Sequence, residues 1–229
     1  MKKTDLAFLA VVLLVFLPFA LSAPLYGLYL SLTASHGMAM SFVKFAVLAT
    51  LGEMLGLRIS TGRYASPGFG ILPRAVVWGL LGMGINMAII VFSKGVPAFA
   101  AYLGVHHPAA IMDGPLSWSK AALALAISVT MNCIFAPVFM TLHKVTDTHI
   151  LATGGTLRGL FTPIPMGRIL QELNWQVQWN FVFKKTIPLF WFPAHTVTFL
   201  LPSEMRVLFA ALLGVALGVI LAVAARKKR

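Results

Sequence analysis

Residues 6 to 35 form an apolar stretch without a charged side chain. A helix needs about 20 apolar residues to cross the hydrocarbon core of a bilayer, so this stretch is long enough to span it. In the whole chain 59% of the residues are hydrophobic and 10% are charged, whereas a soluble domain has about 25% charged residues. A water-soluble globule is therefore excluded, and we expect an all-α, polytopic transmembrane helix bundle that forms a single domain over residues 1–229.

Five to six segments of the chain are predicted to enter the membrane. Pro18 and Pro24 predict a kink or a break within the first apolar stretch, because each removes a backbone donor. A cleaved signal peptide is the alternative there, since Lys2 and Lys3 precede the apolar run. The other segments are residues 38–59, 75–92, 121–142, 186–201 and 207–225. The fifth is only about 24 Å long against a core of about 30 Å, so it is re-entrant or strongly mismatched, and a five-span chain is the alternative.

The basic residues predict the orientation of these segments. With the N-terminus inside, most of the 18 Lys and Arg residues lie in cytoplasmic segments, and the outside loops contain only Lys94 and Lys120. The formal net charge of +12 is then a consequence of topology, and no nucleic-acid partner is expected. We expect a multi-pass protein of the cell membrane with both termini in the cytoplasm.

Residues 162–186 differ from the membrane segments. Their apolar residues recur at helical spacing, which predicts an amphipathic helix in the membrane interface. The expected interfacial anchors are Trp175, Trp179, Lys184 and Lys185, because aromatic and basic side chains gather near lipid head groups. The alternative is that this helix packs on the cytoplasmic mouth of the bundle.

Small residues recur four apart in two segments. Gly52 and Gly56 share one face of the second segment, and Gly214 and Gly218 share one face of the last. Such strips let helix backbones approach closely in lipid. They predict packing inside the chain's own bundle, or a homo-oligomer or membrane-protein interface as the alternative.

Glu53 is the most informative residue because a charge at membrane depth is costly unless it is paired or hydrated. It lies nine residues from Lys44, which places the two side chains on opposite helix faces. Arg206, at the edge of the last segment, is the candidate partner. Three further polar residues could line the same interior: Asn86, Asn132 and His195. They indicate either a structural ion pair with polar interhelical contacts or a solute path.

Nothing in the chain indicates catalysis. The six acidic residues are scattered, and no nucleophile elbow, phosphate loop or carboxylate pair is present. Two histidine pairs, His106 with His107 and His143 with His149, lack the further ligands that a metal site needs. We therefore expect no enzymatic activity, no cofactor and no metal.

The order of these features resembles the Mpv/PMP family of small integral membrane proteins of peroxisomes and the inner mitochondrial membrane. The resemblance covers residues 38–225. It rests on Gly52 and Glu53 in LATLGEMLG, on Arg74 opening a Gly-rich segment, and on Ala136 and Pro137 in NCIFAPVFM. The most specific part is FPAHTVTFLLPSEMR, which contains Phe192, Pro193, Phe199, Pro202 and Arg206.

Several features depart from that family's pattern, among them the missing Trp-Tyr pair of the Gly-rich segment and the missing Gln and Asn before the second Pro of the last motif, where the interval is about two residues short. The family's Asp-Gln before Ala-Pro is replaced by Met131 and Asn132, and residues 1–37 would be an additional segment. The resemblance implies a channel-like helical membrane protein without enzymatic activity. Together with the residues at depth, it leads us to expect a channel or a transporter of a small solute. The alternative is a scaffold protein that binds another membrane protein.

Overall fold

The computed structural model describes residues 2–226, and all its regular elements are helices, as the sequence predicts. The elements, in chain order, are α1 (Lys3–Leu21), α2 (Ala23–Ser35), α3 (Gly37–Thr61), α4 (Ile71–Tyr102), α5 (Pro108–Asp113), α6 (Trp118–Ala152), α7 (Leu157–Leu160), α8 (Met166–Glu172), α9 (Trp175–Val177), η1 (Gln178–Trp191), α10 (Phe192–Leu200) and α11 (Ser203–Arg226).

Five of these helices are long and apolar enough to cross a membrane: α1, α3, α4, α6 and α11. They coincide with five of the predicted segments, which supports a multi-pass integral membrane protein. The helices α4 and α6 contain 32 and 35 residues and extend well beyond the apolar stretches at 75–92 and 121–142.

The first apolar stretch is broken in two, as Pro18 and Pro24 predict. Ser22 ends α1 and caps α2, with extended backbone angles (φ −124°, ψ 103°). Its side-chain oxygen accepts a hydrogen bond from the Leu25 amide at 3.4 Å. Pro18 remains inside α1, whereas Pro24 lies at the start of α2, where its missing donor costs little.

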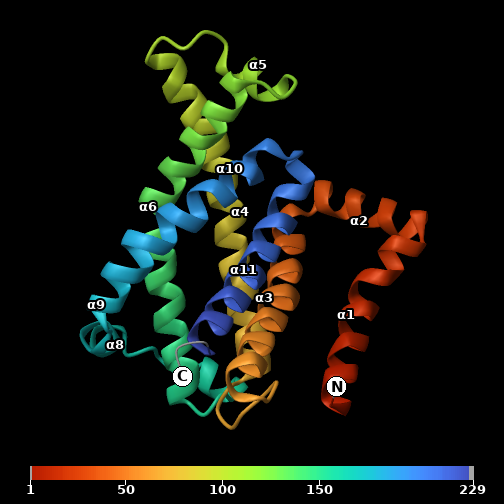
Figure 1. Cartoon of the computed structure of the whole chain (residues 1–229), viewed down its shortest axis with the longest axis vertical. Coiled ribbons are helices and arrows are strands. Elements are labelled where there is room, and N and C mark those ends of the chain that lie inside the picture. The colour runs from red at the N-terminus through yellow and green to blue at the C-terminus, as the bar shows by residue number, and fades with distance from the viewer. Residues whose placement is uncertain (1, 227–229) are drawn as a thin grey trace.

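The fifth segment is longer than the apolar stretch at 186–201. Its helical path begins at Trp175, becomes π-helical over η1 and continues into α10, because Phe192 keeps helical backbone angles. Figure 1 shows α9, η1 and α10 rising along α6 to the far end of the bundle. The predicted start is too late in the chain, because Lys184 and Lys185 lie within the helical path and not before it. Lys184 instead lies over the ring of Trp179, at 5.6 Å.

The single amphipathic helix predicted at 162–186 is wrong in its extent. Only α8 is a separate helix, and Leu173 leaves it with extended backbone angles (φ −62°, ψ 137°). The side chain of Asn174 then accepts a hydrogen bond from the Val177 amide at 3.0 Å and so begins a new helix. Trp179, Lys184 and Lys185 therefore belong to the rising segment.

The core lies where α3, α4, α6, α10 and α11 meet. Its buried side chains include Phe45, Ile89, Ile127, Phe199 and Ala211. Glycines on α4 allow the closest approach. A Cβ atom at Gly82 would lie 2.4 Å from Cβ of Phe45, so only glycine lets α3 and α4 pack this closely.

The small-residue strips pack inside the chain. A Cβ atom at Gly52 would lie 3.1 Å from Val215, and one at Gly56 would lie 3.8 Å from the carbonyl oxygen of Gly218. These contacts join α3 to α11, which is the packing within the bundle that the sequence predicts. Gly214, one turn before Gly218, has open space in front of it.

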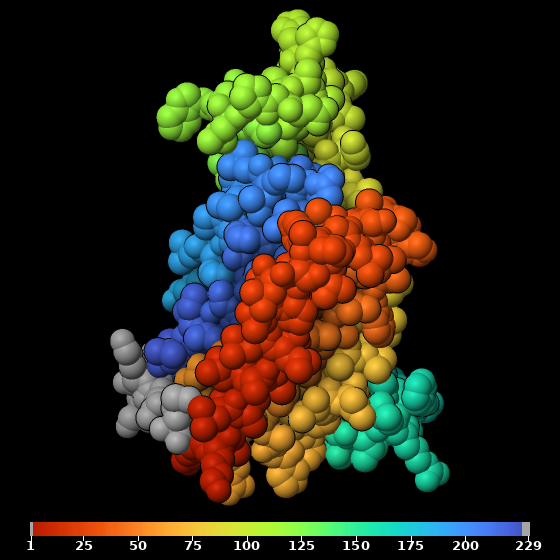
Figure 2. Space-filling view, turned by 90° about the vertical axis from the view of Figure 1, so that its right-hand side faces the viewer, coloured from red at the N-terminus to blue at the C-terminus, as the bar shows by residue number. Residues whose placement is uncertain are grey.

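The helices α1 and α2 lie on the outside of this bundle, and Figure 2 shows α1 crossing its face. No residue of α1 is buried. Its first turn is attached to the bundle through Asp5, which forms two hydrogen bonds with Arg58 at 2.8 and 3.0 Å. Figure 1 shows the start of α1 and the end of α11 at the same end of the bundle. Three of the terminal basic residues, 227–229, lie outside the described residues.

Candidate functional site

A cavity of about 300 Å³ lies inside the bundle. Residues from α3, α4, α6, η1, α10 and α11 line it, so every helix of the central bundle contributes to its wall. Five large aromatic side chains, Phe45, Trp78, Phe135, Phe139 and Trp191, are part of that wall. The polar lining residues are few: Glu53, Asn132, His143 and His195. The interior is therefore mainly apolar, with isolated polar groups.

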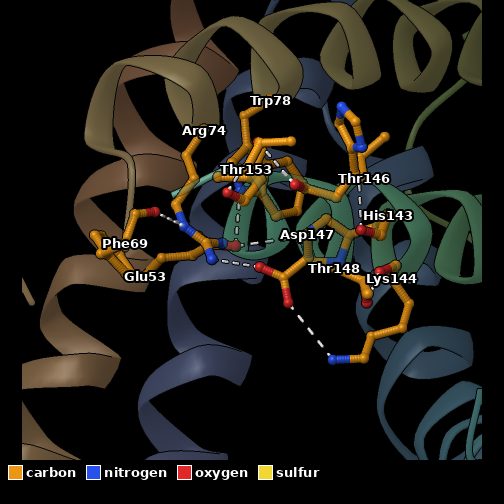
Figure 3. A network of polar contacts seen from close by, with 12 residues as sticks. Glu53, Phe69, Arg74, Trp78, His143, Lys144, Thr146, Asp147, Thr148 and Thr153 are labelled. Carbon is orange, nitrogen blue, oxygen red and sulfur yellow. Dashed lines mark hydrogen bonds and ion pairs between the residues drawn. The ribbon is translucent and has the colours of Figure 1, made fainter. Parts of the chain in front are cut away.

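Glu53 is the only carboxylate among the lining residues, and two other helices, α4 and α6, supply its partners (Figure 3). It forms an ion pair with Arg74 of α4, with 2.5 Å between Oε2 and the guanidinium. Its Oε1 accepts a hydrogen bond from the indole N–H of Trp78 at 3.0 Å and lies 3.3 Å from Nε2 of His143 on α6. Its carboxylate thus links α3, α4 and α6 at one end of the cavity.

Arg74 is the centre of the charge network behind that cavity wall. Its guanidinium is buried and is shared between Glu53 and Asp147, and its Nε donates to the carbonyl oxygen of Phe69 at 2.6 Å. Lys144 lies 3.5 Å from the second oxygen of Asp147 and is half exposed. Because Arg74 does not line the cavity and its donors are used by protein acceptors, Glu53 is the group that presents charge to the cavity.

His143 connects the network to the aromatic wall. Its ring lies against Trp78, with 4.4 Å between the ring centroids. It precedes Asp147 by one helical turn on α6, so the two side chains reach Glu53 and Arg74 from the same helix face. An imidazole beside a carboxylate can exchange a proton with it or with a bound solute.

A second polar group lies further along the cavity. His195 of α10 is buried and stacks on Trp191, and its Nδ1 lies 3.2 Å from the Thr198 hydroxyl. Asn132 of α6 donates to the carbonyl oxygen of Ser128 at 2.8 Å, one turn earlier on the same helix. Both residues line the same cavity as Glu53, so the structure places three of the five predicted polar residues together.

The predicted pairing of Glu53 with Arg206 is wrong. Arg206 donates to the carbonyl oxygens of Leu201 and Phe199, at 3.0 and 3.3 Å, and so closes the turn between α10 and α11. It reaches those carbonyls because Pro202 separates the two helices just before it. Asn86 is buried but does not line the cavity, and its amide lies 3.4 Å from the sulfur of Met38.

The predicted interfacial anchors lie on the outer surface. Trp175 and Trp179 are half exposed, and the Trp175 indole donates to the carbonyl oxygen of Leu170 at 2.8 Å. That bond ties the start of the rising segment to α8. Lys184 and Lys185 are exposed. Within residues 2–226 no group of three His, Cys, Asp or Glu side chains is placed to hold a metal ion.

Four site residues were missed by the sequence reasoning: Arg74, Trp78, His143 and Asp147. A signal for them exists in the sequence. Arg74 and Trp78 are four residues apart on one helix, and His143 and Asp147 are four residues apart on another. Both pairs lie at the ends of apolar stretches. The sequence pattern places Arg74 just outside the predicted segment 75–92, because the charge-free stretch begins after it. The helix in fact begins at Ile71, so Arg74 lies in its first turns.

Comparison of the chain with known protein families, curated proteins and solved structures gives no match. The functional interpretation therefore rests on the geometry of this site.

Proposed function

We propose that the protein is a channel-like membrane protein or transporter that binds a small solute in its central cavity. The observation that carries this proposal is the cavity itself, with Glu53 at its wall. Ligand sites in proteins typically measure about 300–1,000 Å³, with mostly apolar walls and a few polar groups that orient the ligand. The cavity has this character, and its volume of about 300 Å³ suits a small molecule.

The chemistry of the wall favours a solute with an apolar body and one polar end. Aromatic side chains provide most of the contact area, and Glu53 with His143 provides a hydrogen-bonding end. The end of the solute that meets Glu53 would be a hydrogen-bond donor or a cation, because a carboxylate only accepts hydrogen bonds and aromatic faces attract cations. Asn132 and His195 would contact the solute further along the cavity.

The position of the ion-pair network favours movement of the solute as well as binding. Glu53, Arg74 and Asp147 join α3, α4 and α6 beside the cavity. A rearrangement of these pairs would change the spacing of the three helices around the cavity. We place both termini in the cytoplasm, because basic residues concentrate in the segments at their end.

We also propose membership of the Mpv/PMP family. The resemblance rests on residues far apart in the chain, and the structure brings several of them together. Glu53 pairs with Arg74, and Ala136 lines the same cavity. The gathering of these residues in and beside one cavity supports the proposal.

The small-residue strips gave the scaffold alternative its main support. Gly52, Gly56 and Gly218 are used in the contact between α3 and α11. These three glycines therefore do not favour a partner, and we retain solute transport as the proposed function.

Flux into liposomes tests the proposal. Purified protein would be reconstituted, and osmotic swelling in isosmotic glycerol, choline chloride and sodium acetate would be followed by light scattering. We expect faster swelling than in protein-free liposomes for at least one solute, and a clear change for Glu53→Gln. The matched control is Glu172→Gln, which removes an exposed acid on α8. Equal swelling with and without protein for every solute would overturn transport.

A further inference from the structure

We propose that a phospholipid lies between α1 and α3, with its phosphate bound by Lys44, Tyr29 and Thr33. This site is separate from the central cavity. It is carried by two observations: a buried lysine that has no acidic partner, and a transmembrane helix whose side toward the bundle is left partly unpacked.

Lys44 lies on α3 and is only 6% exposed. Its ammonium donates a hydrogen bond to the Thr33 hydroxyl at 3.1 Å and lies 4.7 Å from the centre of the Tyr29 ring. An ammonium has three donors, so this contact leaves two of them without a partner. None of the ion pairs among residues 2–226 includes Lys44.

A cation buried in this position would be stabilised by an anion. A charge that is removed from water and left unpaired is costly, and buried charges in proteins are normally paired or hydrogen-bonded. Every acidic side chain of the chain lies elsewhere: Asp5, Glu53, Asp113, Asp147, Glu172 and Glu204. An anion at Lys44 would therefore come from outside the chain.

Tyr29 supplies a second free donor at the same place. Its hydroxyl is buried and has no hydrogen-bond partner. It lies one helical turn before Thr33 on α2, so both side chains share the face that meets Lys44. An ammonium with two unused donors and a phenol without an acceptor match the oxygens of a phosphate group.

The space beside α1 would hold an acyl chain of the lipid. The residues of α1 that face the bundle, Phe8, Val12 and Val15, are only partly buried, and none of the helix is fully buried. Contacts at the two ends hold the helix in place: Asp5 with Arg58 at one end, and Phe19 against Tyr29, at 5.6 Å, at the other. An acyl chain along α1 would complete this packing.

The depth of the site fits a phosphate at the membrane surface. Thr33 lies in the last turn of α2, just before α3 begins, so the Lys44 side chain extends toward that end of its helix. Long basic side chains in membrane proteins extend in this way to reach head groups. The bound lipid therefore belongs to the leaflet on the side of α2, away from the chain termini (Figure 1).

Thermal unfolding of the full chain in detergent tests the proposal. The protein would be titrated with dioctanoyl phosphatidylglycerol, dioctanoylglycerol or inorganic phosphate. We expect a saturable rise of the unfolding midpoint with phosphatidylglycerol only. Lys44→Met should weaken the apparent affinity about tenfold, and Tyr29→Phe should weaken it several-fold, since each removes a donor to the phosphate.

Two control variants make the result specific. Tyr26→Phe removes an exposed hydroxyl from the same helix, and Lys94→Met removes an exposed ammonium at the end of the bundle that carries α5. Both should respond like the wild type. Equal responses of Lys44→Met and the wild type would overturn the proposal. A midpoint shift of the same size with dioctanoylglycerol, or with inorganic phosphate, would overturn it too.

Discussion

Glu53 of α3 and Arg74 of α4 form an ion pair at the wall of the cavity, with 2.5 Å between the carboxylate and the guanidinium. The pair explains how a carboxylate can lie within a transmembrane helix, because its charge is compensated by a neighbouring helix. Arg74 also pairs with Asp147 of α6, so loss of this one side chain would remove the buried cation that Glu53 and Asp147 share.

Replacing Arg74 by methionine should therefore destabilise the protein strongly. Removal of one member of a buried ion pair costs about 3–5 kcal/mol, because the remaining charge stays buried and unpaired. The free energy of unfolding in detergent measures this effect. Arg168→Gln is the control, since it breaks an exposed pair with Glu172 that contributes about 0–1 kcal/mol. The prediction would be contradicted if Arg74→Met lowered the free energy of unfolding by no more than the control variant does.

Two glycines on α4 should respond in opposite directions to alanine. A methyl group at Gly82 would meet Phe45, which is itself buried, so Gly82→Ala should destabilise the protein by about 1–3 kcal/mol. Gly84 has open space around it, so Gly84→Ala should stabilise α4 by about 0.5–1 kcal/mol through lower chain entropy. The free energy of unfolding in detergent, measured for both variants, tests this difference. Similar changes in that free energy for both variants would show that α3 and α4 are less closely packed than described.

Gly214→Leu should block the cavity without disturbing the fold. Gly214 lines the cavity, and no atom lies within 4 Å of a Cβ atom placed there. A leucine would occupy space that a solute needs, so liposome flux should fall while the unfolding midpoint stays close to that of the wild type. Gly84→Leu adds the same side chain outside the cavity and should leave flux unchanged. Equal flux in both variants would argue against a route through the cavity.

Tyr64 should titrate at an unusually high pH. Its hydroxyl donates to Asp5 at 3.2 Å, and partial burial followed by this hydrogen bond raises the pKa of Tyr64 above its ordinary value. The folded protein then holds the phenolic proton more tightly than the unfolded chain. The resulting contribution to stability is complete below about pH 10 and is lost as the pH rises through the folded pKa.

Absorbance at 295 nm, taken as the difference between wild type and Tyr64→Phe, measures this ionisation. We expect a midpoint above about 10, and a lower one in Asp5→Asn, because the neutral side chain no longer disfavours the phenolate. A midpoint that is the same in both backgrounds would show that Asp5 does not act on Tyr64.

The sequence was sufficient to predict that the fold is all-helical, that the chain breaks after the first helix, and that the charge of Glu53 needs a partner. All three follow from local chemistry: apolar length, proline geometry and the cost of a buried charge. The packing of Gly52 and Gly56 inside the bundle was predicted as one of two outcomes. It follows from the same local pattern of small residues.

The helix ends and the partner of Glu53 could not be predicted in this way. A charge-free stretch ends at the first charged residue, but a helix continues past that residue when another helix neutralises the charge. Arg74 and Asp147 are paired across α4 and α6, and both helices extend over them. The partner choice depends on which helices are neighbours, and that information lies in the tertiary structure.

The lengths of α4 and α6 have a practical consequence. At 1.5 Å per residue they measure about 48 and 52 Å, whereas the hydrocarbon core is about 30 Å thick. The two helices are therefore longer than a single crossing requires, and Figure 2 shows the tip that joins them standing clear of the remaining helices. An epitope inserted between His106 and His107 would provide an accessible handle for antibodies or purification, far from the ion pairs at the opposite end.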